Sequence, residues 1–158
     1  SYAWRQSITD ETLCKEAVDR AFVLLSQFVD SPVYQWLENA RTIYREIPFI
    51  YTRDDRIIHG IIDTLFQRRD GSWVILDYKT STLKKQNPTL ADLNDHARRY
   101  HLQLGVYAEA TIAQLSGVIP ETYIHYIRYN QAVQVNAEDW REALSRSLSE
   151  RIVDLIEE

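Results

Sequence analysis

The sequence predicts a single α/β domain in which one mixed β-sheet packs against helices. Segments with apolar residues at helical spacing and segments of period two follow one another in the order αβββαβ, with a short strand and a last helix after them. The chain has 158 residues, of which 45% are hydrophobic, so it is long enough to enclose one sizeable core.

Two helices are expected before the first strand. Apolar residues recur at helical spacing from Asp10 to Val29, and Thr9 precedes them as a candidate N-cap. Ser31 and Pro32 then begin a second helix, with serine as the cap and proline at the first helical position. This second helix is expected to end near Ala40.

Three strands are expected to follow. The pattern changes to period two between Thr42 and Phe49, where Pro48 fits an edge strand or a bulge. The sequence TRDD then turns the chain into a second strand, Arg56 to Arg68, and RDG turns it into a third, Ser72 to Lys79. One face of the first strand is expected to carry Ile43, Arg45, Ile47 and Phe49.

The remaining elements complete the αβ end of the pattern. Ser81 to Asp95 is polar and is interpreted mainly as a loop, and a long helix follows from about His96 to Leu115 until Gly117 ends it. Thr122 to Tyr129 is expected to form a fourth strand, and Ala132 to Val135 is expected to extend the sheet after a turn at residues 129–131. Asn136 caps a last helix whose apolar face carries Trp140, Leu144, Leu148, Ile152 and Leu155.

Composition excludes several classes of protein. Cys14 is the single cysteine, which excludes an internal disulfide and any all-cysteine zinc or iron–sulfur site, and which fits a reducing cytoplasm. No apolar run approaches the roughly 20 residues that a membrane span needs, so no membrane partner is expected. The net charge of −5 disfavours a general nucleic-acid-coating protein, but it allows an enzyme with one local basic patch.

The hairpin formed by the second and third strands carries an aspartate on each strand. A two-residue turn at Asp70-Gly71 would place Asp63 opposite Tyr78, with Asp77 on the other face. A three-residue loop, Arg69 to Gly71, with the glycine in the left-handed conformation, would place Asp63 opposite Asp77. The second alternative brings the two carboxylates within roughly 5 Å at Cβ.

Two carboxylates this close favour a divalent cation between them. Like charges raise the pKa of one carboxyl group unless positive charge is near, and Mg²⁺ typically binds through one or two carboxylates, water and phosphate. Lys79 shares the face of Asp77, where it can offset charge on a phosphoryl group. The chemistry indicated is metal-assisted phosphodiester hydrolysis. The alternative is an aspartate and a lysine that are solvated or salt-bridged at the ends of strands.

Four motifs together resemble those of the PD-(D/E)XK nucleases, and more narrowly their RecB-like branch. GIID (residues 60–63) and DYKT (77–80) resemble the G-x-x-D…D-x-K signature, YREIPF (44–49) resembles the glutamate-containing first strand, and YHLQLGVYAEA (100–110) resembles the glutamine–tyrosine helix. The resemblance is strong over residues 42–115 and implies a restriction-endonuclease-like αβββαβ core. Within this branch, the chain most resembles the nuclease domains at the C-terminus of AddA- and RecB-type helicase–nucleases of the UvrD/Rep superfamily.

The resemblance implies roles for individual residues. Asp63 and Asp77 match the metal ligands, the backbone carbonyl of Tyr78 matches a third ligand, and Lys79 matches the catalytic lysine. Glu46 matches a supporting acid that binds a second metal or a water; the alternative is a strand-surface glutamate paired with Arg45 or Arg56.

The helix motif and a basic segment are expected to border this site. Gln103 and Tyr107 lie four residues apart on one helical face that Tyr100 completes, and the resemblance places this stripe over the site, touching Lys79 or substrate. The alternative is a helix that packs its aromatic residues on the sheet. Two interpretations are open for the basic residues Lys84, Lys85, Arg98 and Arg99. They neutralise DNA phosphates, or they form an ordinary solvated surface.

The function implied is a Mg²⁺-dependent DNA exonuclease, with Mn²⁺ as a possible substitute, in a cytoplasmic helicase–nuclease that repairs double-strand breaks by recombination. The expected partners are DNA, motor domains in the same polypeptide that alone use ATP, and an AddB- or RecC-like subunit. The alternatives are a stand-alone structure-specific endonuclease of the same superfamily, and an inactive module that binds DNA ends or a partner. The intact acids and lysine disfavour an inactive module.

The sequence departs from the RecB-like pattern at one point. That branch supplies a metal-binding histidine from a helix upstream of the glutamate strand, but Ser1 to Arg41 contain no histidine. Ser1 to Gln6 do not resemble a natural start, so we expect an N-terminally truncated fragment of a larger protein. Such a fragment should bind divalent metal weakly and cleave DNA feebly, and an N-terminal extension should restore both.

Overall fold

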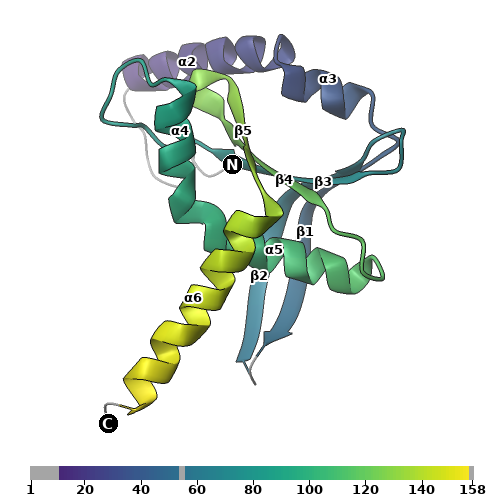
Figure 1. Cartoon of the computed structure of the whole chain (residues 1–158). Helices are drawn as coiled ribbons and strands as arrows, with labels where there is room; N and C mark the ends of the chain where they lie inside the picture. The colour runs from purple at the N-terminus through teal and green to yellow at the C-terminus, as the bar shows by residue number, and fades with distance from the viewer. Residues whose placement is uncertain (1–10, 54–55, 157–158) are drawn as a thin grey trace.

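The computed structural model describes residues 11–53 and 56–156, apart from the side chains of residues 11, 12 and 148–156. The described helices and strands (Figure 1) are α2 (Glu11–Val29), α3 (Pro32–Glu38), β1 (Thr42–Arg53), β2 (Arg56–Gln67), β3 (Trp73–Lys79), α4 (Leu90–Ala97), α5 (His101–Gln114), β4 (Glu121–Tyr126), β5 (Gln131–Val135) and α6 (Ala137–Ile156). No helix in this part of the chain is long and apolar enough to cross a membrane.

The strands form one mixed sheet, as the sequence predicts. Their spatial order is β1-β2-β3-β4-β5, and every neighbouring pair is antiparallel except β3 and β4, which are parallel. β1 is an edge strand, so Pro48, which has no N–H to donate, occupies a position where proline is tolerated. The mixed α/β architecture is consistent with the predicted core.

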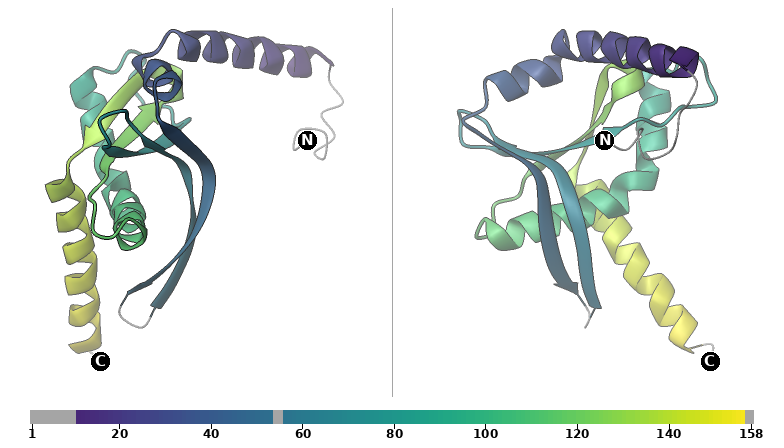
Figure 2. Two further views of the ribbon diagram at one scale, coloured as in Figure 1. Left: turned by 90° about the vertical axis from the view of Figure 1, so that its right-hand side faces the viewer. Right: turned by 180° about the vertical axis from the view of Figure 1, so that it is seen from behind.

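Helices cover both faces of the sheet (Figure 2), and successive side chains of β3 are buried on opposite faces. Val74 and Leu76 are fully buried in a cluster with residues of α3, whereas Ile75 is fully buried in a second cluster with residues of α4, α5 and α6. A strand buried on both faces needs apolar residues at every position, and VIL in β3 provides them. Asp77 ends this run, so its carboxylate is placed at the edge of the second cluster.

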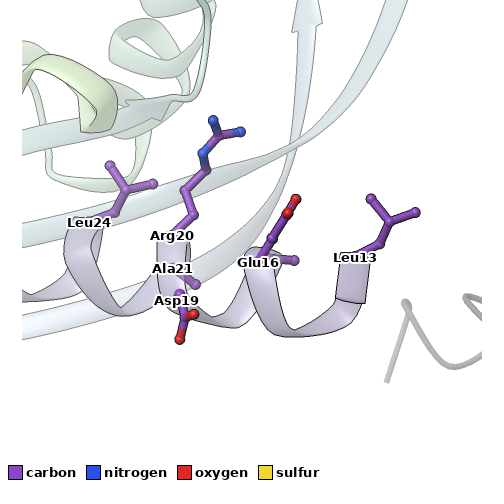
Figure 3. Close-up of a pocket in the computed structure, with 7 residues that line it drawn as sticks. Leu13, Glu16, Asp19, Arg20, Ala21 and Leu24 are labelled. Carbon is purple, nitrogen blue, oxygen red and sulfur yellow. The ribbon is translucent and has the colours of Figure 1, made fainter. Parts of the chain in front are cut away.

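Helix α2 makes fewer contacts with the rest of the domain than its apolar residues would allow. Phe28 packs against the sheet, but Val18, Phe22, Leu25 and Val29 are each more than half exposed. The hollow in Figure 3 lies along this helix, and no predicted site residue lines it. Thr9, the predicted cap of α2, lies outside the described residues. The predicted cap of α3 is present, because Ser31 Oγ accepts a hydrogen bond from the backbone N–H of Tyr34.

The predicted loop and long helix between residues 81 and 115 are wrong in part. Residues 90–97 form α4, whose N-terminus is a capping box between Thr89 and Asp92. Residues 98–100 then form a 3₁₀ turn, so α4 and α5 are separate helices with different directions, as Figure 1 shows. This break allows Leu93 of α4 and Leu104 of α5 both to be fully buried.

The C-terminal half differs from the prediction in one further detail. The fourth strand ends at Tyr126, and residues 127–129 form a 3₁₀ turn that leads into β5. Asn136 immediately precedes α6, and Trp140 is buried as predicted. The side chains of Leu148, Ile152 and Leu155 lie outside those that the structure describes, as do Asp54 and Asp55 of the first turn.

The predicted apolar face of β1 is also wrong, because the strand exchanges faces at Glu46. Ile43 packs in the α3 cluster, whereas Ile47 and Phe49 pack in the cluster on the opposite face of the sheet. Glu46 lies between them with a φ of 52°, in the left-handed region. A residue in that conformation interrupts the strict alternation of a strand, so the residues after it face the other way.

Candidate active site

The β2–β3 hairpin has the three-residue loop that brings the two aspartates into register. The backbone N–H of Arg68 donates to the carbonyl of Ser72 at 2.9 Å, which leaves residues 69–71 as the loop, and Gly71 has a φ of 93°. The paired residues run from Gln67–Trp73 to Thr64–Leu76. The next position in this register places Asp63 opposite Asp77, which is the second of the two predicted alternatives.

The two strands separate at the aspartates. The β2–β3 pairing ends at Thr64–Leu76, and beyond it the backbone N–H of Tyr78 donates to Asp63 Oδ2 at 2.9 Å instead of to a backbone carbonyl. β3 meanwhile stays paired with β4 as far as Lys79. The remainder of β1 and β2 continues as a two-stranded arm, visible in Figure 2. The Asp63 carboxylate therefore lies at the fork between the arm and the sheet.

Asp77 is a buried carboxylate with a cation beside it. Its side chain is 3% exposed, and Lys79 Nζ lies 2.6 Å from Asp77 Oδ2. Burial raises the pKa of the Asp77 carboxyl group; the Lys79 ammonium opposes this increase, and Asp63 adds to it. The Lys79 ammonium group is therefore the partner of Asp77 Oδ2, as the alternative interpretation of a salt-bridged aspartate and lysine expects.

The glutamine–tyrosine helix lies over Lys79, in the predicted place. Lys79 Nζ donates to Gln103 Oε1 at 3.0 Å, and Gln103 Nε2 donates to the Tyr107 hydroxyl at 2.7 Å. The amide of Gln103 thus has its oxygen toward the lysine and its nitrogen toward the tyrosine. Tyr107 is buried, which raises the pKa of its hydroxyl group, and its ring also packs on Phe49. Both interpretations of this stripe therefore apply, because it contacts Lys79 and packs on the sheet.

Glu46 lies in line with Asp63. The pairs on either side of it, Arg45–Thr64 and Ile47–Ile62, place Glu46 opposite Asp63 on the neighbouring strand. Its side chain is exposed, and no ion pair to Glu46 is found in the described part of the chain. The pairing with Arg45 or Arg56 that the alternative interpretation requires is thus not observed. The role of Glu46 stays a prediction.

The four basic residues are all exposed, but two of them have acidic partners. Lys85 pairs with Asp92 at 2.7 Å and Arg98 pairs with Asp95 at 3.5 Å. Exposed pairs of this kind contribute little to stability, so a phosphate could replace either acid at little cost. Lys84 lies in the loop before α4, and Arg99 lies in the 3₁₀ turn after it. Their contact with DNA stays a prediction.

The residues at the fork fit a hard divalent cation. Asp77 contributes a buried carboxylate whose charge is partly offset by Lys79, and Asp63 contributes a second carboxylate that accepts a hydrogen bond from the backbone N–H of Tyr78. Within the described residues no group of three or more His, Cys, Asp and Glu side chains lies close enough to hold a metal. Two carboxylates without a larger cluster match the few protein ligands that Mg²⁺ uses.

Ser81 is a residue near the site that the sequence did not single out. Its Oγ lies 2.9 Å from the hydroxyl of Tyr100, and either atom can donate this hydrogen bond. Ser81 follows Lys79 by two residues, but it lies beyond the end of β3, where strand alternation no longer predicts direction. No sequence signal identifies this contact.

Several curated proteins with similar sequences are named as subunits of ATP-dependent helicase/nucleases. The chain is 36% identical over 115 residues to an ATP-dependent helicase/nuclease subunit of Lysinibacillus sphaericus, a match that covers 68% of this chain and 9% of the relative. It is 28% identical over 145 residues to the protein of the same name from Alkaliphilus oremlandii, covering 83% and 11%. The chain thus spans about a tenth of the length of these curated relatives.

A solved structure and a family model agree with the fold. A protein from Eubacterium rectale, named by inference an exonuclease, superposes with a TM-score of 0.55 at 16% identity, covering 81% of this chain and 48% of that one. At this identity the likeness supports the fold alone. The model of the PD-(D/E)XK nuclease superfamily matches residues 3–158, which is nearly the whole chain. The chain therefore belongs to the PD-(D/E)XK nuclease superfamily.

Proposed function

We propose that the chain is a metal-dependent DNA exonuclease domain that hydrolyses phosphodiester bonds at the fork between β2 and β3. The observation that carries this proposal is the convergence of Asp63, Asp77 and Lys79 at the point where the two strands separate. A nuclease needs a cation near the scissile phosphate, and these residues offer two carboxylates and an ammonium group on one face of the sheet.

Each residue has a distinct part in the proposed reaction. Asp63, Asp77 and the carbonyl of Tyr78 would hold Mg²⁺ or Mn²⁺, which supplies charge that polarises the phosphate and lowers the pKa of a bound water. Lys79 would offset negative charge that develops on the phosphoryl group. Gln103 holds Lys79 through its oxygen and is itself held by Tyr107. Glu46 would act as a supporting acid beside Asp63.

We extend the proposal to the larger molecule from the relatives. Because they are named as parts of a helicase/nuclease and are about ten times longer, the chain would be one nuclease domain of a longer polypeptide with motor domains. DNA delivered by such a motor would reach the exposed basic residues Lys84, Lys85, Arg98 and Arg99, which would border the site. The proposal also includes a partner subunit and a role in double-strand-break repair.

Cleavage of end-labelled linear DNA tests the proposal. Under single-turnover conditions, Mg²⁺ or Mn²⁺ should support release of short products from DNA ends, and EDTA should abolish it. A covalently closed circle of the same sequence should be spared if the enzyme is an exonuclease. Cleavage of the circle would instead indicate an endonuclease of the same superfamily. No metal-dependent cleavage of either substrate, even by a chain extended at its N-terminus, would indicate a binding module.

Two substitutions separate the roles of ligand and catalyst. Lys79→Ala should reduce the cleavage rate by about 100-fold or more while metal affinity stays near that of the parent, because lysine does not bind the metal. Asp77→Ala should lose both cleavage and metal affinity, because it removes a ligand. Calorimetry with Mn²⁺, beside single-turnover cleavage, measures both quantities. Equal Mn²⁺ affinity in Asp77→Ala and the parent would overturn the assignment of Asp77.

A further inference from the structure

The Lys79 ammonium group has a third contact besides Asp77 and Gln103. Its Nζ lies 4.4 Å from the centroid of the Tyr100 ring, at the distance of a cation–π interaction. Asp77 Oδ2 and Gln103 Oε1 lie 2.6 and 3.0 Å from the same nitrogen. An ammonium group has three N–H bonds and no acceptor, so a carboxylate, an amide oxygen and a ring face together surround it.

The Tyr100 ring is itself fixed from two sides. Ser81, just past the end of the strand that carries Lys79, is hydrogen-bonded to the Tyr100 hydroxyl at 2.9 Å. The ring of His96 lies against Tyr100 with centroids 5.7 Å apart, and His96 Nδ1 is in turn hydrogen-bonded to the hydroxyl of the buried Tyr126 at 2.9 Å. The ring is therefore supported by both the loop after β3 and the helix α4.

Tyr100 and Gln103 reach Lys79 from one short segment, at the junction of the 3₁₀ turn and α5. Tyr100 ends the 3₁₀ turn, and Gln103 lies in the first turn of α5, three residues later. Residues three apart on a helical segment share a face, so one segment presents both a ring and an amide oxygen to Lys79.

We propose that Tyr100, held by Ser81, is a positioning residue that fixes the Lys79 ammonium group for phosphodiester hydrolysis through the face of its ring. This inference rests on the proposed function and adds a residue pair to it. A ring face attracts a cation without adding a carboxylate that would compete with Asp63 and Asp77 for a divalent metal. It also keeps the lysine in place when the Asp77 oxygen engages another cation.

Stepwise fluorination of the ring tests whether its face acts on the cation. Phenylalanine carrying none, one, two or three ring fluorines is incorporated at position 100; each fluorine withdraws charge from the ring face while the shape changes little. kcat for cleavage of linear DNA should fall progressively, to about a fifth or a tenth of the Tyr100→Phe value, with KM unchanged, because cation–π contacts at partly buried sites are worth roughly 1 kcal/mol. A flat series in a cleaving enzyme would overturn the proposal.

Two controls accompany the series. The same amino acids at Tyr34, whose ring packs edge-on against Phe28 on the α3 face, should leave kcat unchanged. Ser81→Ala and Tyr100→Phe each remove one side of the same hydrogen bond, so the double variant should lose no more activity than either single variant. Additive losses would show that Ser81 does not act through Tyr100.

The ring contact also has a readout that needs no cleavage. In proton NMR, the ε-methylene signals of Lys79 should be shifted upfield by the ring current, should stay shifted in Tyr100→Phe, and should return to ordinary lysine values in Tyr100→Leu. Ordinary values in the unsubstituted chain would overturn the inference. Shifted signals in a chain that shows no metal-dependent cleavage would instead overturn the proposed function, and the positioning role of Tyr100 with it.

Discussion

His125 is buried, with no hydrogen-bond partner for either ring nitrogen in the described part of the chain. It is 1% exposed, and its ring contacts Phe28 of α2 and Tyr78 of β3, with centroids 5.4 and 6.0 Å apart. Burial lowers the pKa of His125 to about 4, because the apolar surroundings disfavour the imidazolium ion. Between its ordinary pKa of 6.5 and about 4, His125 is therefore neutral in the folded chain but protonated in the unfolded chain.

Acid should therefore destabilise the fold through His125. Between the ordinary pKa of 6.5 and about 4 the unfolded chain binds one more proton than the folded chain, so stability is complete above the first value and falls as pH decreases toward the second. The loss by pH 4 is about 3 kcal/mol. Urea denaturation at a series of pH values should show it, and His125→Phe, which keeps the ring, should remove this part of the slope. Identical slopes would refute the account.

Glu46 has a backbone conformation that costs free energy. The left-handed region disfavours residues with a side chain by roughly 1–2 kcal/mol, and strain of this kind is often retained at functional sites. Glu46→Gly should therefore be more stable than Glu46→Ala by about 1 kcal/mol, although both variants lose the carboxylate and should cleave DNA poorly.

The order of these two variants is the informative result. At Thr52, an exposed β1 position with an ordinary backbone conformation, alanine should be more stable than glycine, as is usual in strands. Chemical denaturation of the four variants measures both differences. If alanine is the more stable residue at position 46 as well, the strand does not change faces there as described.

At the scale of elements, α5 and α6 approach closely at a glycine. A Cβ added to Gly105 would lie 2.8 Å from Leu144 Cγ and 3.1 Å from the carbonyl oxygen of Trp140. Gly105→Ala should therefore cost about 1–3 kcal/mol through overpacking, although alanine is the better helix former. Denaturation midpoints of Gly105→Ala, with the exposed α5 control Ala113→Gly, provide the measurement. A stabilising Gly105→Ala substitution would mean that the two helices are further apart.

The same scale shows why some elements could be predicted and others could not. The sequence predicts two possible registers for the β2–β3 hairpin, because turn chemistry and strand period are local properties. The structure has the register in which Gly71 adopts a positive φ. The sequence does not predict α4, because its capping box has Asp92 at the position where glutamate or glutamine is the usual signal. The change of face at Glu46 has no local signal, because glutamate does not indicate a positive φ.

In the candidate site as well, some residues could be predicted from local rules and others could not. Asp63, Asp77 and Lys79 could be predicted to lie together, because they lie on paired strands whose geometry follows from register. Their proximity to Gln103 came from the family resemblance, since no local rule relates β3 to α5. Ser81 and the ring contact of Tyr100 depend on how the loop after β3 meets the turn before α5, which only tertiary packing determines.

At the scale of the whole molecule, the chain spans about a tenth of its curated relatives, and residues 1–41 lack the histidine that the RecB-like branch uses as a further ligand. If the chain is one domain of a longer polypeptide, as proposed, we expect an N-terminal extension of several tens of residues from it to increase Mn²⁺ affinity and the rate of cleavage of linear DNA. Both proteins should be compared at equal Mg²⁺. Equal rates would mean that residues 1–158 already hold the complete site.

A divalent metal is proposed to bind where β2 and β3 separate, and paramagnetic broadening by substoichiometric Mn²⁺ tests this binding without requiring cleavage. In NMR spectra of the backbone amides, the signals of Asp63, Asp77 and Tyr78 should broaden first, and Asp77→Asn should leave them sharp at the same Mn²⁺ concentration. Broadening that begins instead at the acidic residues of α4, Asp92 and Asp95, or that Asp77→Asn does not change, would show that the metal does not bind between β2 and β3.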